Sequence, residues 1–154
     1  ACRAVGLAGA CAPPRASGVS AAEPISGEEE ARAFVARLAD ELGAPDAMAM
    51  LDRYAALLLE ENQRQNLISK PSEAQLWQRH IADSAQLLHF VPRETLGSGA
   101  QGPWLDLGSG PGLPGLVIAI LCPQMPVTMV ESRARRVTFL NHCLAELALP
   151  KAQV

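Results

Sequence analysis

The sequence predicts an α/β protein in which a helical N-terminal region precedes a parallel sheet. Three observations carry this prediction: an apolar run at 104–107, a glycine-rich turn directly after it, and a second β-rich run at 127–131. A strand, a glycine-rich loop and a helix form the first unit of a nucleotide-binding α/β sheet. Before residue 92 the apolar residues recur at helical spacing instead.

Composition limits the class of protein. The chain has 154 residues, of which 49% are hydrophobic, so one domain or slightly more can bury a core. The net charge of −3 argues against a generally basic nucleic-acid binder but allows a local basic patch. No apolar run is long enough to span a membrane, and the four cysteines lack metal-ligand spacing. We therefore expect a cytoplasmic monomer without a metal or a membrane partner.

The first 92 residues divide into two parts. Residues 1–24 are rich in Ala, Gly, Pro and Ser and show neither strand nor helix period, which predicts a disordered extension. Residues 25–92 form the predicted helical region. Its first helix is expected to be capped by Ser26, to carry three glutamates in its first turn and to stop at Gly43.

Two further helices are expected before a linker at 93–103. The second begins at Asp46 and ends in a polar stretch where Asn62 and Asn66 lie one turn apart. Its apolar face holds Met50, Tyr54, Leu57 and Leu58. The third begins with a capping box at 72–75 and runs to about Phe90.

The third helix carries a group of charged residues. Arg79 and Asp83 are spaced to pair at i,i+4, and His80 and Asp83 at i,i+3. A His–Asp pair can serve as acid–base machinery, although a satisfied core or interface histidine is the commoner reading. The residues alone assign no role to this group.

The glycine spacing after the first strand indicates the ligand. A dinucleotide fingerprint reads G-x-G-x-x-G, whereas the spacing from Gly108 is G-x-G-x-G. Asp106 would repel a pyrophosphate and suits a cationic amine. S-adenosylmethionine has an ammonium and a sulfonium group and no phosphate, so the pattern favours this cofactor over a nicotinamide dinucleotide. The open alternative is a Gly/Pro-rich turn without a ligand.

The segments after the glycine loop extend the pattern. A helix is expected from Leu113 to Leu121, with a proline near its first turn. Glu131 follows the second strand, 23 residues after Gly108, where this fold expects a carboxylate for ribose hydroxyls; the alternative is a solvated acid. A basic helix follows, with a third strand beginning near the end. Its expected buried side is Val137, Leu140, Leu144 and Leu147.

Four motifs together resemble a known family. They are N-x-x-x-N-L at 62–67, R-H-I-x-D-S at 79–84, D-L-G-S-G-P-G-L-P-G at 106–115 and F-L at 139–140. This combination resembles the bacterial 16S ribosomal RNA (guanine-N7)-methyltransferase family known as RsmG or GidB. The resemblance implies a class I (Rossmann-like) methyltransferase fold with an N-terminal helical region. It also implies S-adenosylmethionine as donor and guanine N7 in the 530 loop of 16S rRNA, within the small ribosomal subunit, as acceptor.

The resemblance also implies site residues. Gly108 and Leu113 would contact the cofactor, Gly110 and Gly112 would shape the loop, Asp106 would sit near the methionine end, and Glu131 at the ribose. The family usually has Asp at the last position, and Glu131 keeps the carboxylate. Basic residues near the site are candidates for phosphate contacts, with a solvated basic face as the alternative. They are Lys70, Arg133, Arg135 and Arg136.

The length of the chain leaves alternative functions open. Only two complete strands are expected at 104–154, so this segment would be the first part of the methyltransferase domain and the chain a C-terminally truncated piece. The alternatives are a methyltransferase for another substrate, or an inactive fragment or RNA-binding module. A nicotinamide-dependent oxidoreductase is disfavoured by Asp106 and by the glycine spacing.

Overall fold

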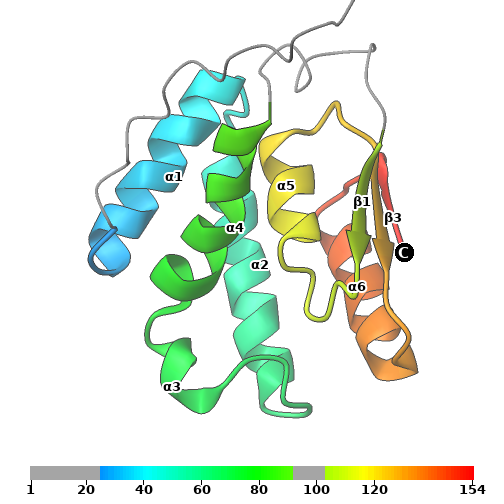
Figure 1. Cartoon of the computed structure of the whole chain (residues 1–154). Coiled ribbons are helices and arrows are strands. Elements are labelled where there is room, and N and C mark those ends of the chain that lie inside the picture. The colour runs from blue at the N-terminus through cyan, green and yellow to red at the C-terminus, as the bar shows by residue number, and fades with distance from the viewer. Residues whose placement is uncertain (1–24, 92–102) are drawn as a thin grey trace, which may run out of the picture.

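The computed structural model describes residues 25–91 and 103–154. The predicted extension at 1–24 and nearly all of the predicted linker at 93–103 lie outside these residues. Within the described part, a layer of helices lies beside a short parallel sheet, and helix α5 lies between the two (Figure 1). This arrangement confirms the α/β class.

The first helix, α1 (Glu28–Leu42), ends at Gly43, whose left-handed backbone (φ 67°) closes the last turn as expected. Its N-cap is Gly27, so the expectation for Ser26 was wrong. The Ser26 hydroxyl and backbone N–H instead donate to the Glu30 carboxylate at 2.9 and 2.7 Å. These two hydrogen bonds join Ser26, which precedes the helix, to the first turn of α1.

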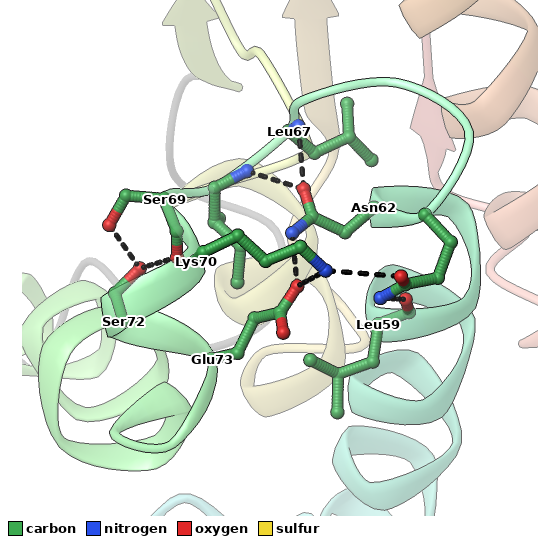
Figure 2. A network of polar contacts seen from close by, with 9 residues as sticks. Leu59, Asn62, Leu67, Ser69, Lys70, Ser72 and Glu73 are labelled. Carbon is green, nitrogen blue, oxygen red and sulfur yellow. Dashed lines mark hydrogen bonds and ion pairs between the residues drawn. The ribbon is translucent and has the colours of Figure 1, made fainter.

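The second helix, α2 (Ala47–Asn62), has Asp46 as its N-cap and buries the predicted apolar face, with Met50 only partly covered. It stops at Asn62, so Asn66 does not follow it by one helical turn, contrary to expectation. The Asn62 side chain itself ends the helix. Its Oδ1 accepts the backbone N–H groups of Leu67 and Ile68 at 2.7 and 2.9 Å, and its Nδ2 donates to Glu73 at 2.6 Å (Figure 2).

The predicted third helix is a chain of short pieces that ends at Phe90 as expected. The pieces are α3 (Lys70–Glu73), the π-helical η1 (Trp77–Ala82), α4 (Asp83–Gln86) and the 3₁₀ turn η2 (Leu87–Phe90). The N-cap is Ser69, so the capping box expected at 72–75 was wrong. The Ser72 hydroxyl donates to the Ser69 carbonyl at 2.8 Å, so its partner lies three residues before it and not, as predicted, three residues after it (Figure 2).

Three parallel strands form the sheet in the order β1-β2-β3: β1 (Trp104–Leu107), β2 (Val127–Val130) and β3 (Ala152–Gln153). Asp106 lies opposite Met129, and Leu107 lies opposite Val130. Since side chains alternate across a strand, Asp106 and Met129 share the buried face. Leu107 and Val130 lie on the other face, 73% and 47% exposed.

Helix α5 (Gly115–Leu121) is buried at every residue, because it packs on β1 and β2 on one side and on α2 and α4 on the other. It begins at Gly115 rather than at Leu113, since Pro114 is its N-cap. A continuous cluster of buried apolar side chains therefore joins the helical region to the sheet. The carboxyl ends of β1 and β2, the end of α2 and the start of α6 meet at the lower end of the molecule in Figure 1.

Helix α6 (Ala134–Glu146) begins after the N-cap Arg133, as the basic run predicts. Its buried side chains are Phe139, Leu140 and Cys143, and Leu147 directly after its end is buried too, so the prediction is confirmed for Leu140 and Leu147. Val137 and Leu144, which we expected to be buried, are only partly covered. The helix packs against both β3 and α2. The surface that it buries against two elements differs from the single apolar stripe on which the prediction was based.

We expect Asn62→Ala to lower the free energy of unfolding by about 2–3 kcal/mol, because two backbone N–H groups lose a buried acceptor. Urea unfolding followed by circular dichroism measures the loss. The control is Gln63→Ala, one position on, where the exposed side chain makes only a 3.5 Å contact to Leu59 and one to Lys70. Equal losses in the two variants would contradict a special role for Asn62.

Candidate cofactor and RNA site

The glycine loop at 108–114 joins β1 to α5. Gly108 (φ 84°) takes a backbone conformation that residues with a side chain rarely adopt. A Cβ at Gly108 would meet no atom within 4 Å, so this position faces open space. The backbone N–H groups of Gly108 and Ser109 donate to the Val130 carbonyl at 2.8 and 3.1 Å. The loop is thereby fixed to the end of β2 while one side of it stays accessible.

Asp106 lies beneath the loop and is 8% exposed. Its Oδ2 accepts the backbone N–H of Gly115 at 3.1 Å, at the start of α5. A Cβ at Gly115 would lie 2.7 Å from that oxygen, so only glycine allows this approach. The hydroxyl of the fully buried Ser109 donates to the Asp106 carbonyl at 3.0 Å. Asp106 therefore supports the loop from the core side.

Glu131 holds the loop from the end of β2. Its Oε2 accepts the Gly110 N–H at 3.0 Å, and its Oε1 accepts the Arg133 N–H at 2.9 Å. The Arg136 guanidinium lies 3.6 Å from Oε2, and the Glu131 side chain is only 6% exposed. These contacts, chiefly the Arg133 N–H, lower the pKa of Glu131 from its usual range. The carboxylate is thus ionised and close to the loop at neutral pH.

Tyr54 is a site residue that the sequence reading placed only on an apolar helix face. Its fully buried hydroxyl donates to the Pro111 carbonyl at 3.0 Å, across 57 positions of sequence. Burial raises the pKa of Tyr54 well above its usual range, so the hydroxyl keeps its proton and remains a donor. Helix α2 thereby positions the middle of the glycine loop. No local pattern marks such a contact.

Leu113 and Pro114, at the end of the loop, face η1 and α4 across a hollow of about 240 Å³. The residues that line it from the helix side are Arg79, His80, Asp83, Ser84 and Leu87. The motif at 79–84 therefore lies beside the glycine loop, although 23 residues separate the two along the chain. Gly112 lies on the inner side of the loop, where a Cβ would meet the Leu116 side chain at 2.4 Å.

The pairing expected within the 79–84 motif is not formed. Neither the Arg79 nor the Asp83 side chain makes an ion pair with any residue in the described ranges 25–91 and 103–154. Arg79 lies on the π-helical turn at 77–82, and Asp83 follows it. His80 instead shares a 2.9 Å hydrogen bond with the Ser72 hydroxyl. Partial burial lowers the pKa of His80, so the ring is neutral at pH 7.

A basic groove of about 520 Å³ lies beside the other end of the loop. Its lining residues are Arg64, Gln65, Asn66, Arg133, Ala134, Arg135 and Arg136. Arg135 donates to the Arg64 carbonyl at 3.1 Å, and Gln65 donates to the Arg135 carbonyl at 3.3 Å. These two contacts join the loop after α2 to the start of α6. Arg64 was missed by the sequence reading, because its neighbours along the chain are acidic and amide side chains.

Lys70 lies away from this groove, at the start of α3. Its ammonium is paired with Glu73 at 3.1 Å and donates to the side-chain oxygen of Gln63 at 3.0 Å (Figure 2). Three of the four predicted phosphate contacts thus line one groove and the fourth does not.

Metal ligands, membrane-spanning helices and thiols can also be assessed in the described part of the chain. Within residues 25–91 and 103–154 no group of three or more His, Cys, Asp or Glu side chains is arranged to hold a metal ion. In the same residues no helix is both long and apolar enough to cross a lipid bilayer. Burial raises the pKa of Cys122 to about 11 and that of Cys143 to about 12, so both thiols stay protonated at neutral pH.

A parallel β1–α5–β2 unit with a glycine loop, and with an acidic residue at the end of each strand, defines the α/β domain of a class I (Rossmann-like) methyltransferase. A family model described as GidB, rRNA small subunit methyltransferase G, matches residues 47–154. The chain belongs to this family, which confirms the resemblance drawn from the four motifs. Membership of a methyltransferase family implies S-adenosylmethionine as methyl donor in general terms.

Curated relatives carry the same description. The chain is 51% identical over 130 residues to the "Ribosomal RNA small subunit methyltransferase G" of Erythrobacter litoralis, covering 84% of this chain and 58% of that protein. It is 45% identical over 146 residues to the protein of that name in Sphingopyxis alaskensis, covering 92% and 59%. The chain therefore spans less than two thirds of the length of these relatives.

We expect Glu131→Gln to lower the melting temperature at pH 7 by a few degrees, because a neutral amide holds the Gly110 and Arg133 N–H groups less strongly than a carboxylate. The pKa of Glu131 is lower in the folded protein than in the unfolded chain, where it is about 4.3. The stabilisation is therefore complete above that value and is lost as the pH falls through the folded pKa. Differential scanning calorimetry from pH 7 to pH 3 should show the difference shrinking.

The control for this measurement is Glu29→Gln, which removes an exposed carboxylate in the first turn of α1. Its melting temperature should stay close to that of the unchanged protein. A deficit in Glu131→Gln that persists undiminished at pH 3 would show that the charge is not what holds the loop.

Proposed function

We propose that this protein takes part in S-adenosylmethionine-dependent methylation of guanine N7 in the 530 loop of 16S ribosomal RNA. The observation that carries the proposal is the glycine loop at the carboxyl end of β1, held by Asp106 and Glu131, in a chain of the methyltransferase G family. The partner would be 16S rRNA or the small ribosomal subunit. The protein would bind it in the cytoplasm, as a monomer and without contact with a membrane.

The geometry of the loop supports the cofactor assignment. Gly108 opens onto free space, so a ligand can approach its backbone closely. Glu131 lies at the end of the next strand, where a carboxylate can accept ribose hydroxyl groups. In this proposal Gly108 and Leu113 contact the cofactor, Gly110 and Gly112 shape the loop, and Asp106 acts from below by holding the start of α5.

The proposed reaction requires little acid–base catalysis from the protein. Guanine N7 carries a lone pair and no proton, and the bound cofactor supplies an electrophilic methyl group. Methyl transfer at this atom therefore needs no general base, and we propose no catalytic residue. The protein contributes by aligning the base with the methyl group and by excluding water.

The basic groove supports an RNA partner. Four arginines line one surface of a chain whose net charge is −3. Arg64 and Arg136 are paired with glutamates there, whereas Arg133 and Arg135 form no ion pair within the described residues and supply positive charge beside the glycine loop. Guanidinium groups bind phosphate with two parallel hydrogen bonds. We propose Arg64, Arg133, Arg135 and Arg136 as the main phosphate contacts, with Lys70 on α3 as an outlying one.

Gly108→Ala should weaken S-adenosylmethionine binding, because a Cβ there points into the space that the cofactor would use. Isothermal titration calorimetry of this chain measures the affinity. The matched control is Gly43→Ala, which has a similar positive φ and equally open surroundings but caps α1. Both variants should lose stability, by about 1–2 kcal/mol of backbone strain. Equal affinities in the two variants would remove the loop from the proposal.

Arg133→Gln should lower the slope of log affinity for RNA against log salt by roughly 0.7–1, since one phosphate contact releases its counterions. The probe is an RNA stem-loop of the 530 region, titrated at several salt concentrations with fluorescence anisotropy as readout. Arg37→Gln, an exposed site on α1, removes the same charge away from the groove and should leave the slope unchanged. A slope that Arg133→Gln leaves intact would exclude this residue.

A further inference from the structure

The 79–84 motif, which lines the hollow opposite Leu113, has no role in the proposed cofactor or phosphate binding. The hollow opens beside the glycine loop, so a group held in it would lie close to a cofactor on that loop. Its walls come from η1 and α4 on one side and from the end of the loop on the other. The hollow thus lies between the two parts of the chain.

Two charges in this hollow have no partner among the described residues. Arg79 and Asp83 are both exposed, and neither side chain forms a hydrogen bond or ion pair within residues 25–91 and 103–154. On a regular α-helix this spacing would favour an ion pair. The π-helical turn that carries Arg79 is a rare feature that recurs at functional sites. A donor and an acceptor therefore line the same hollow without an ion pair between them.

The electrostatics of the hollow differ from those of the basic groove. Asp83 offsets Arg79, and the neighbouring His80 is uncharged at pH 7 because burial lowers its pKa. The groove, in contrast, gathers four arginines. A phosphate would favour the groove, while the hollow suits a neutral group that offers both hydrogen-bond donors and an acceptor.

The volume of the hollow and its apolar walls indicate which kind of neutral group it would bind. At about 240 Å³ the hollow is smaller than the roughly 300–1,000 Å³ typical of pockets for drug-sized ligands, so it suits one planar base rather than a whole nucleotide. Leu87, Leu113 and Pro114 offer apolar surface to the face of a ring. Enzymes that modify bases bind a flipped base between such surfaces and bind its Watson–Crick edge by hydrogen bonds.

We propose that this hollow binds the target guanine, with Asp83 and Arg79 as its specificity-determining residues. The Asp83 carboxylate accepts the N1–H and the exocyclic N2–H₂ groups of guanine, and the Arg79 guanidinium donates to O6. N7 lies on the edge that neither residue uses, so it stays free to accept a methyl group. Adenine would present a lone pair at N1 to the carboxylate and is therefore rejected. This inference rests on the proposed function and names how its substrate is recognised.

The test replaces each guanine of the 530-region stem-loop in turn by inosine, which lacks only the exocyclic amino group. Binding to this chain is measured by fluorescence anisotropy with S-adenosylhomocysteine present. At one position the unchanged protein should prefer guanine by roughly tenfold, the effect of one lost hydrogen-bonded group. Asp83→Ala should bring that ratio close to one. Arg79→Ala should weaken both RNAs equally, because inosine keeps O6.

Asp40→Ala, an exposed site on α1, is the matched control and should keep the tenfold ratio. A ratio that persists in Asp83→Ala, or a stem-loop in which no replacement matters, would overturn the guanine pocket while RNA and cofactor binding uphold the proposed function. A chain that binds neither the stem-loop nor S-adenosylmethionine would overturn both.

Discussion

Two carboxylates at the ends of adjacent parallel strands hold the loop on which the rest of the site depends. Asp106 accepts the N–H at the start of α5 from the core side, and Glu131 accepts the Gly110 N–H from the end of β2. Each contact satisfies a backbone donor that no helix or strand partner reaches. The loop is therefore shaped before any ligand arrives, and its outer side remains available. Tyr54 adds a third restraint through the Pro111 carbonyl.

Helix α5 explains why the helical region takes part in the site. It is buried on every side, so the sheet and the N-terminal helices share one apolar core. Packing against α2 and α4 brings η1 and Arg79 to one end of the loop. The Asn62 network fixes the path of the chain after α2 (Figure 2). Arg64 lies on this path and lines one groove with the start of α6. A change in the helical layer would therefore alter both surfaces that flank the loop.

The two surfaces that flank the glycine loop, the basic groove and the hollow, differ in charge. The groove beside α6 is lined by four arginines, two of them paired with glutamates, whereas the hollow beside α4 holds one cation, one anion and a neutral histidine. Phosphate contacts supply affinity without sequence information, and contacts to base edges supply specificity. In this arrangement the groove would hold the RNA backbone while the hollow selects one base. The glycine loop between them is where a methyl donor would meet that base.

Sequence alone determined the α/β class, the glycine loop, the strand positions and the last residues of α1 and α5, because these follow from side-chain periodicity and backbone preferences over a few residues. The family followed from the resemblance of four motifs. The sequence could not predict that the third helix would break into π and 3₁₀ turns and leave Arg79 and Asp83 unpaired. It also missed Tyr54 on the loop and Arg64 beside Arg135, contacts that span 57 and 71 positions. Only the packing of α2, α5 and α6 around a shared core decided these, since residues so distant in sequence meet through tertiary contacts and not through any local pattern.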